Sequence, residues 1–289
     1  MIVDLHMHST ASDGVLAPAA LMRCAADAGI GMLALTDHDS LDGLDESRAA
    51  AIAAGMHWIS GVELSVQWQG VSLHVLGYAF DTGSTVLREA LAGVQQGRWQ
   101  RAQQIDERLA AKRMPGALEG ACAMQVAAGG DARQPPGRPH FADWMVEAGY
   151  VRDRAEAFRK WLGAGKLGDI RQHWPTLEQG VAWLRESGGI AVLAHPCQYN
   201  LTRSRLRRLL RDLVAAGGQG VEVVNGNQPP EQVAYLGKLC VEFGLLASCG
   251  SDFHQPGSPW AALGRMTTMP ADCQPIWQRW IGQSATISA

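Results

Sequence analysis

The sequence has few of the features that mark a membrane, secreted or thiolate-metal protein. Charged residues make up only 18% of its 289 residues, and no apolar run approaches the ~18 residues of a membrane span. Its six cysteines form no C-x-x-C pair, so neither a disulfide framework nor a thiolate zinc site is indicated. The first residues lack the basic segment of a signal peptide. We therefore expect a cytoplasmic protein that makes no membrane contact.

Common catalytic and nucleotide-binding motifs are also missing. No G-x-S-x-G motif occurs, and no cysteine has a histidine placed by a known motif, which disfavours covalent acyl chemistry. There is no glycine-rich phosphate loop of the Walker or dinucleotide type. The net charge of −3 is too small to indicate a nucleic-acid coat or a membrane patch. The chemistry must therefore depend on other residues.

Short apolar runs rich in β-branched residues alternate with helical patterns, which is typical of an α/β fold with parallel strands. Thr176 and Gln179 have the spacing of a capping box at the start of one such helix. Two alternating runs, 63–68 and 71–78, flank a turn and predict a hairpin attached to the third strand. The predicted strands are residues 2–5, 32–35, 58–62, 190–194, 221–224 and 245–248.

The alternation stops after Phe80 and returns only near Ile190. Residues 81–173 have mostly helical patterns and carry 14 Lys and Arg against 11 Asp and Glu, a balance of +3, whereas the remainder carries −6. We predict a barrel formed by residues 1–80 and 174–289, with residues 81–173 as a helical insertion, or cap, over its C-terminal face. The charge difference indicates either a basic surface facing an acidic site or ordinary surface variation.

Acidic and imidazole side chains follow the predicted strands. In a parallel α/β barrel the C-terminal strand ends meet at one face, so these residues would converge although they span about 250 residues of sequence. His6 and His8 are two residues apart and point to the same side of an extended strand. Taken alone, His74 is better explained as a half-buried histidine, but within this set we favour it as a metal ligand. The candidate metal ligands are His6, His8, Asp13, His38, Glu63, His74, His195, Asp252 and His254.

Imidazoles and carboxylates without thiolates suit Mn²⁺, Fe²⁺ or Zn²⁺, and the carboxylates favour the harder ions. A catalytic ion takes about three protein ligands, so nine candidates can hold two or three ions if Glu63 bridges. Ions about 3.5–4 Å apart can share a hydroxide and stabilise both oxygens of a displacement at phosphorus. Asp4 and Asp37 are expected to orient the histidines, or else to have a plain structural role.

The segments DLHMHS (4–9), TDHD (36–39), LAHP (193–196) and GSDFH (250–254), together with Asp13, Glu63 and His74, resemble the PHP (polymerase and histidinol phosphatase) family. The resemblance covers residues 1–80 and about 174–269. It implies a distorted seven-stranded (β/α) barrel, a metal-dependent phosphoesterase activity and three divalent ions. Of these ions we expect Mn²⁺, with Fe²⁺ and Zn²⁺ as alternatives.

Segments 137–141, 173–176 and 188–196 resemble the bacterial branch that removes the 3′-phosphate from nucleoside 3′,5′-bisphosphates. The resemblance implies hydrolysis of pAp to AMP and phosphate by a metal-bridging hydroxide held in part by Asp252. His195, His254 or a metal-bound water would protonate the leaving oxygen. The alternatives are a 5′-to-3′ exonuclease on short 5′-phosphorylated RNA, a histidinol-phosphate phosphatase, and a non-catalytic metal-binding module.

Substrate contacts are expected mainly from the basic insertion, whose cations would hold the 5′-phosphate. Asn225, at a strand end, is a candidate for sugar or phosphate contact. Trp99, Trp144 and Trp174 either stack on a base or pack in a core. The partners expected are a nucleotide and, in the alternative, short RNA, with no obligate protein partner. The candidate phosphate-binding residues of the insertion are Arg133, Arg138, His140 and Lys166.

Overall fold

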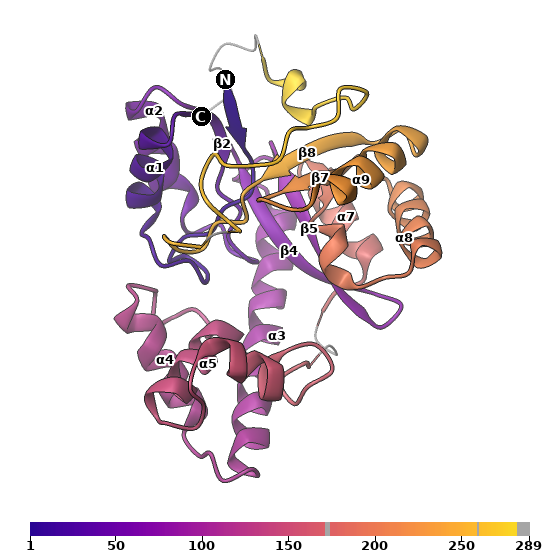
Figure 1. The fold of residues 1–289 in the computed structure, drawn as a ribbon. Helices are drawn as coiled ribbons and strands as arrows, with labels where there is room; N and C mark the ends of the chain where they lie inside the picture. Colours follow the sequence, from indigo (N-terminus) through magenta and orange to yellow (C-terminus); the bar gives the residue numbers. More distant parts are fainter. Residues whose placement is uncertain (171–173, 259, 282–289) are drawn as a thin grey trace.

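The computed structural model describes residues 1–170, 174–258 and 260–281, and its strands form two sheets (Figure 1). The parallel strands of the first sheet are β1 (Ile2–Asp4), β2 (Ile30–Ala34) and β3 (His57–Ile59). The second sheet has the order β4 (Gly61–Trp68), β5 (Val71–Tyr78), β6 (Ile190–Leu193), β7 (Gly220–Asn225) and β8 (Leu246–Gly250). The mixed α/β class, the β4–β5 hairpin and the strand positions other than that of 58–62 are confirmed.

A single closed seven-stranded barrel is not confirmed, because the two sheets meet only through isolated contacts. Next to β1, the N–H of Leu5 donates to the carbonyl of Cys249 (3.0 Å), and a further bridge joins Met7 to Phe253. At the other side the N–H of Glu63 donates to the carbonyl of Asp37 (3.2 Å). The strand predicted over 58–62 is divided between the two sheets.

A glycine at position 61 permits this division. A Cβ on Gly61 would lie 2.4 Å from the carbonyl oxygen of Leu35, so a larger residue could not start β4 against the chain that follows β2. Next to it, the hydroxyl of Ser60 donates to the carbonyl of Phe80 (2.8 Å). The chain therefore leaves the first sheet at Ser60 and continues in the hairpin.

Helices cover the outer faces of both sheets. The predicted capping box is confirmed, since Oγ1 of Thr176 accepts from the N–H of Gln179 at 3.3 Å. The covering helices are α1 (Pro18–Asp27), α2 (Leu44–Ala53), α7 (Leu177–Glu186), α8 (Arg203–Ala216) and α9 (Pro230–Glu242). The predicted insertion contains α3 (Thr85–Ala110), α4 (Ala117–Ala127), α5 (Arg138–Glu147), α6 (Arg154–Ala157) and a π-turn at Phe158–Leu162. Away from the sheets, α4 of this insertion contacts α3 and α5.

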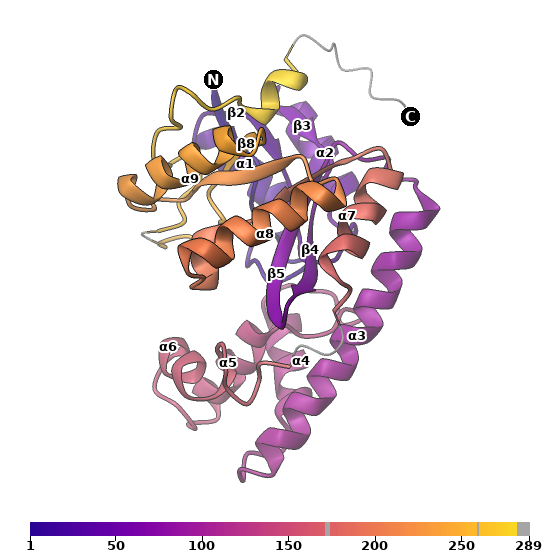
Figure 2. The same cartoon turned by 90° about the vertical axis from the view of Figure 1, so that its right-hand side faces the viewer.

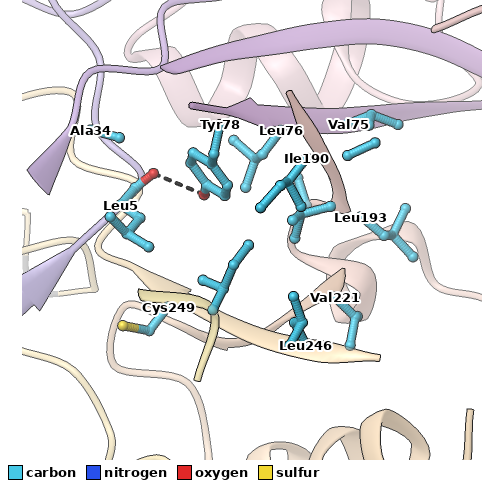
Figure 3. Packing of buried hydrophobic residues seen from close by; sticks show 14 of the residues in the cluster. Leu5, Ala34, Val75, Leu76, Tyr78, Ile190, Leu193, Val221, Leu246 and Cys249 are labelled. Carbon is cyan, nitrogen blue, oxygen red and sulfur yellow. Dashed lines mark hydrogen bonds between the residues drawn. The ribbon is translucent and has the colours of Figure 1, made fainter. Parts of the chain in front are cut away.

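The described residues contain two hydrophobic clusters. The larger one fills the space between the sheets, where the hydroxyl of Tyr78 donates to the carbonyl of Leu5 (2.9 Å; Figure 3). The smaller one lies among α3, α4 and α5. Helix α3 belongs to both, with Leu87 and Leu91 in the larger cluster and Ile105 in the smaller, and Figure 2 shows it running from the sheets to α4–α6. Among these described helices, none combines the length and apolar character required to cross a membrane.

Candidate metal centre

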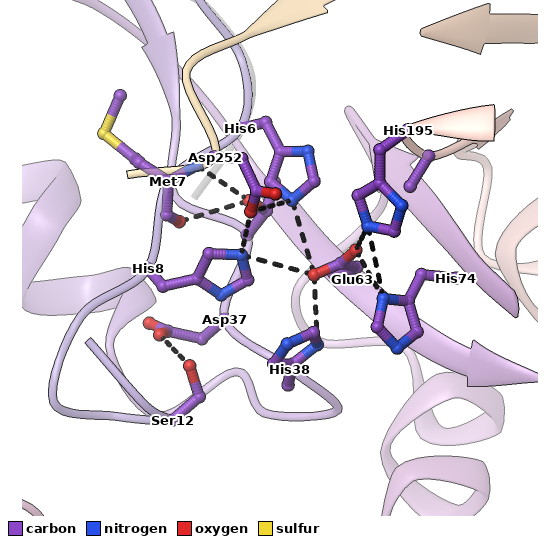
Figure 4. A network of polar contacts seen from close by, with 12 residues as sticks. His6, Met7, His8, Ser12, Asp37, His38, Glu63, His74, His195 and Asp252 are labelled. Atoms are coloured by element: carbon purple, nitrogen blue, oxygen red, sulfur yellow. Dashed lines mark hydrogen bonds and ion pairs between the residues drawn. The ribbon is translucent and has the colours of Figure 1, made fainter. Parts of the chain in front are cut away.

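Glu63 lies at the centre of a cluster of histidines (Figure 4). Its Oε2 is 3.3 Å from Nε2 of His6 and 3.2 Å from Nε2 of His8, both of which follow β1. The same oxygen is 3.0 Å from Nδ1 of His38, which follows β2. One buried carboxylate oxygen on β4 therefore faces three imidazoles from two other parts of the chain.

The second oxygen of Glu63 faces two further histidines. Its Oε1 is 2.9 Å from Nδ1 of His74 on β5 and 2.9 Å from Nε2 of His195, directly after β6. These two ring nitrogens are 3.3 Å apart. The β4–β5 hairpin thus brings His74 to the carboxylate of Glu63, although His74 taken alone gave no functional signal in the sequence.

Two aspartates complete the cluster. Oδ1 of Asp252, after β8, is 3.4 Å from Nε2 of His6 and also 3.4 Å from Nε2 of His8. Oδ1 of Asp13 is 3.3 Å from Nε2 of His254 and 3.9 Å from Nδ1 of His8. The structure therefore brings together all nine residues singled out in the sequence.

The unpaired atoms of this cluster fit bound cations. Several are buried and have no hydrogen-bond partner among the described residues, including Nε2 of His6, both ring nitrogens of His8 and Oε2 of Glu63. A buried unsatisfied polar atom costs about 1–3 kcal/mol, so these atoms call for a ligand from outside the chain. The groups whose ligand atoms lie within 4.8 Å of one another are His8–Asp13–His38–His254, His6–Glu63–His195, His6–His8–Asp252 and His38–Glu63–His74.

The electrostatics of the cluster favour positive charge. Burial alone would raise the pKa of Glu63, but the neighbouring His74, His38 and His6 lower it well below its ordinary value. Burial likewise opposes protonation of His254, yet Asp13 and Asp252 raise its pKa to about 10. The buried carboxylates thus draw protons onto nearby imidazoles, and divalent cations would displace such protons.

Glu222, in the middle of β7, was not among the predicted site residues. Its Oε1 is 3.0 Å from Nδ1 of His6, and its Oε2 accepts from the N–H of His195 at 2.6 Å. The same oxygen accepts from Nδ2 of Asn225 at 3.2 Å, which places this predicted substrate residue beside the cluster. The sequence signal was available, because a glutamate between Val221 and Val223 interrupts an otherwise apolar buried strand.

Of the two roles predicted for Asp4 and Asp37, orienting imidazole rings or a structural role, their hydrogen bonds fit the structural one. Oδ1 of Asp4 accepts from the N–H of Ser251 at 2.8 Å, next to Asp252. The carboxylate of Asp37 accepts from both the N–H (2.8 Å) and the hydroxyl (2.6 Å) of Ser9, next to His8. These buried aspartates therefore fix chain segments that carry the cluster.

The backbone at the cluster is strained. His195 has φ of 26° and Asp252 has φ of 56°, values that cost non-glycine residues of order 1–3 kcal/mol and persist only where the surroundings enforce them. Gly250 allows a close approach between strands, since a Cβ there would lie 2.1 Å from Cβ of His6. Such strain and crowding gather at functional sites.

A cavity of about 140 Å³ lies between the cluster and the predicted insertion. Arg98 and Arg101 come from α3, and Arg138 starts α5. Of these three, only Arg138 was predicted. The charged residues lining the cavity are Asp13, His38, His74, Arg98, Arg101, Arg138 and Asp169.

The other predicted phosphate-binding residues lie elsewhere. Arg133 is exposed and forms a two-pronged ion pair with Asp131, two residues away. Lys166 is exposed, and neither it nor Arg133 lines the cavity. His140 is buried, and its Nδ1 accepts from a backbone N–H at the start of α5 (3.0 Å). None of Arg133, Lys166 and His140 lines this cavity, and their role in phosphate binding stays a prediction.

The three tryptophans also differ in their surroundings. Trp174 is buried, and its ring centroid lies 5.4 Å from Cζ of Arg98 and 4.9 Å from Cζ of Arg101. Trp144 packs against Tyr150 with the ring centroids 5.3 Å apart, and Trp99 is half-buried. Trp174 is thus occupied by arginines, and His173 before it lies outside the described residues.

Comparison with known proteins decides the family. A family model described as "PHP domain" matches residues 4–124. The 3′,5′-nucleoside bisphosphate phosphatase of Chromobacterium violaceum is 38% identical over 96% of this chain and 95% of its own length. The chain belongs to the PHP family. It is accordingly a metal-dependent phosphoesterase, an enzyme of the hydrolase class.

PHP relatives of similar identity carry different names. The 5′-3′ exoribonuclease Rnm of Escherichia coli is 41% identical over 97% of this chain and 94% of its own length. A solved structure described as an amidohydrolase from Chromobacterium violaceum, with bound sulfate and no metal, has a TM-score of 0.89 and 38% identity, covering 96% of this chain and 95% of that one. The PHP assignment therefore fixes the reaction class and leaves the substrate to be argued.

Proposed function

We propose that this protein hydrolyses the phosphate ester on the 3′-oxygen of nucleotides that also carry a 5′-phosphate, with pAp as the simplest substrate. One observation carries the proposal: three members of the nine-residue cluster line the same cavity as three arginines. The cluster members are Asp13, His38 and His74, and the arginines are Arg98, Arg101 and Arg138. A substrate with two phosphates can face both sets of residues at once. The products would be AMP and inorganic phosphate.

The second candidate, trimming of 5′-phosphorylated RNA, involves a closely related bond. An exonuclease that releases a 5′-nucleotide from the 5′ end also breaks the bond between phosphorus and the 3′-oxygen of the first nucleotide. In RNA the phosphorus that is attacked also carries the next nucleotide, whereas the 3′-phosphorus of pAp carries none. The names of the relatives from Chromobacterium violaceum and Escherichia coli correspond to these two cases. One site can therefore serve either substrate, and we place the bisphosphate first.

Divalent ions held by the nine cluster residues would supply Lewis acidity and neutralise the charge that develops on the phosphate oxygens. Mn²⁺ is the ion that we propose, because carboxylates and imidazoles without thiolates suit it. In the reaction, the oxygen of a water forms a bond to phosphorus, and the bond from phosphorus to the 3′-oxygen breaks. The 3′-oxygen leaves with a proton.

His254 is better placed than His195 to deliver that proton. Its side chain is 33% exposed, compared with 7% for His195, whose Nε2 lies against Glu63. The pKa of about 10 keeps His254 protonated at neutral pH before substrate and ions arrive. Because an ion bound by His254 would displace this proton, we propose His254 as the proton donor only while it is not an ion ligand, and otherwise a water.

Residues 81–173 act in this proposal as a cap on the site. Arg98 of α3 contacts Asp39 beside the cluster, and Nη1 of Arg154 donates to Oε1 of Gln255 at 3.2 Å. Gln134 contacts Asp42 on another side. Contacts from different parts of the predicted insertion thus join it to the sheet-bearing part. A cap held in this way would exclude bulk water and favour short substrates.

A substrate panel tests the proposal. Phosphate and nucleotide release would be measured from pAp, short 5′-phosphorylated RNA, single-stranded DNA and histidinol phosphate, after metal analysis of the purified protein. We expect the highest kcat/KM for pAp in the presence of Mn²⁺. A preference for histidinol phosphate would refute the substrate assignment.

Two site variants test whether the cluster performs the reaction. His8→Ala and Asp252→Ala are expected to lower kcat by about 10³-fold or more, because each removes a ligand of the proposed ions. His57→Ala is the matched control, since His57 is an exposed histidine on β3 outside the cluster. Full turnover by both site variants would show that catalysis occurs elsewhere or not at all.

A further inference from the structure

Arg101 is a buried cation that forms no direct ion pair with a carboxylate of the described residues. Its side chain lines the cavity, its exposed fraction is 7%, and its Nε has no hydrogen-bond partner among the described residues. Burial and the nearby charges of Arg98 and Arg138 lower the pKa of Arg101 well below its ordinary value. The carboxylates of Asp39 and Asp13 offset this lowering only in part. A buried charge without a direct ion pair is costly, and an anion bound in the cavity would offset the cost.

Arg98 differs from Arg101 because a carboxylate already neutralises it. Its Nε and Nη2 both lie 2.6 Å from Oδ2 of Asp39, and Nη2 donates to Oγ of Ser65 at 3.0 Å. Burial would raise the pKa of Asp39, but Arg98 and a backbone hydrogen bond from Ser65 lower it. The two arginines are therefore not equivalent, and the charge of Arg101 is the one left for a ligand.

Trp174 holds both guanidinium groups in place. Its indole lies between 4.9 and 5.4 Å from Cζ of Arg101 and Arg98, which is within the range of cation–π contacts. Arg98 and Arg101 are three residues apart on α3, so they lie on the same face of the helix. A guanidinium held in this manner offers a fixed pair of donors to phosphate without losing rotamer freedom on binding.

We propose that Arg101 is the ligand of the non-scissile 5′-phosphate, and that Arg98 and Trp174 are positioning residues that hold it toward the cavity. The 5′-phosphate assignment rests on the proposed function. Asp13, His38 and His74 line the same cavity, so a ligand on Arg101 lies in the space that the cluster borders. The enzyme would accordingly require a terminal 5′-phosphate and discriminate against nucleoside 3′-monophosphates and RNA with a 5′-hydroxyl.

Binding to metal-free protein tests the subsite without catalysis. AMP carries only the non-scissile phosphate, and adenosine carries none, so their affinities are compared by isothermal titration calorimetry. We expect AMP to bind about 10- to 100-fold more tightly than adenosine, the contribution of charged hydrogen bonds to one phosphate. Arg101→Gln should remove most of this difference, and Arg101→Lys, which keeps the charge, should retain part of it. Equal affinities for AMP and adenosine in the wild type would overturn the inference.

Kinetics separates this inference from the proposed function. The readout is the ratio of kcat/KM for pAp to that for adenosine 3′-monophosphate, which we expect Arg101→Gln to lower by about 10- to 100-fold. Arg88→Gln, an exposed arginine on the same helix, is the control and should keep the wild-type ratio. An equal loss on both substrates would contradict a 5′-phosphate subsite. Wild-type protein that binds AMP through Arg101 but hydrolyses neither substrate would refute the proposed function alone.

Discussion

Nδ1 of His6 lies 3.0 Å from Oε1 of Glu222, and both side chains are completely buried. With this nitrogen donating to the carboxylate, Nε2 of His6 keeps its lone pair on the side of Glu63 and Asp252. A carboxylate in this position fixes the tautomer and the direction of a metal-binding imidazole.

Replacing Glu222 should therefore weaken metal binding more than it changes the fold. Glu222→Gln keeps the shape of the side chain but removes its charge, and we expect a loss of about 10- to 100-fold in affinity for Mn²⁺. Competition with a chelator of known affinity would measure the Mn²⁺ affinity of each protein. Glu231→Gln, on the exposed side of α9, is the matched control. Unchanged affinity in Glu222→Gln would show that the His6 contact is dispensable.

Gly250→Ala should disturb the cluster from the backbone. The added Cβ would lie 2.1 Å from Cβ of His6, so β1 and β8 must move apart. Overpacking of this kind costs about 1–3 kcal/mol, which urea unfolding would report as a lower midpoint. Gly93→Ala is the control, because nothing lies within 4 Å of its added Cβ and alanine favours the helix. A Gly250→Ala protein as stable as the wild type would contradict the close approach.

The Asp39–Arg98 pair should make stability depend on pH below about 4. The native pKa of Asp39 is lowered, whereas in the unfolded chain it is about 3.9. Between the native and the unfolded pKa, the unfolded state binds more protons than the native state. The pair therefore contributes its full stability above the unfolded pKa, and this stability is lost as pH falls through the native pKa.

Asp39→Asn gives the comparison for this pH dependence. Asparagine tolerates the positive φ of 49° at this position, and its neutral side chain leaves Arg98 without a carboxylate. We expect the variant to be less stable at pH 6 and to lose less stability than the wild type between pH 5 and pH 3. Urea unfolding at several pH values provides the data, and parallel pH curves for the two proteins would count against the pair.

Metal binding should stabilise the protein and release protons. At a free ion concentration of 100 times Kd, the expected gain is about 2.7 kcal/mol, seen as a higher Tm. Because the pKa of His254 in the metal-free cluster is about 10, an ion that binds there at pH 7 must displace a proton. Calorimetry in two buffers of different ionisation enthalpy would measure this release. Identical binding enthalpies in both buffers would refute it.

Much of the fold could be predicted because its signals are local. Short apolar or alternating runs mark the described strands, and the hydroxyl of Thr176 caps the start of α7 as the capping-box spacing predicts. The cluster of candidate metal ligands could also be predicted, because strand ends converge in α/β folds of this type. By contrast, the closure of the sheets depends on contacts between distant segments, such as Leu5 with Cys249, which no local pattern indicates.

The arginines of the cavity could not be found in the same way. Arg98 and Arg101 lie in a long helical pattern with many polar residues, and only the packing of α3 shows which of its faces meets the cluster. Arg133 looked equally suitable in the sequence, but Asp131 beside it forms an ion pair with its guanidinium. Residue type and net charge therefore located the basic segment without identifying the side chains that border the site.

The continuity of α3 limits how the protein can be re-engineered. A chimaera that exchanges residues 81–173 between relatives would remove Leu87 and Leu91 from the larger hydrophobic cluster along with the cap. The helix enters the smaller cluster only at Ala102, so a graft joined within α3 just before Arg98 would leave the host core intact. It would transfer both cavity arginines of the helix as one rigid unit.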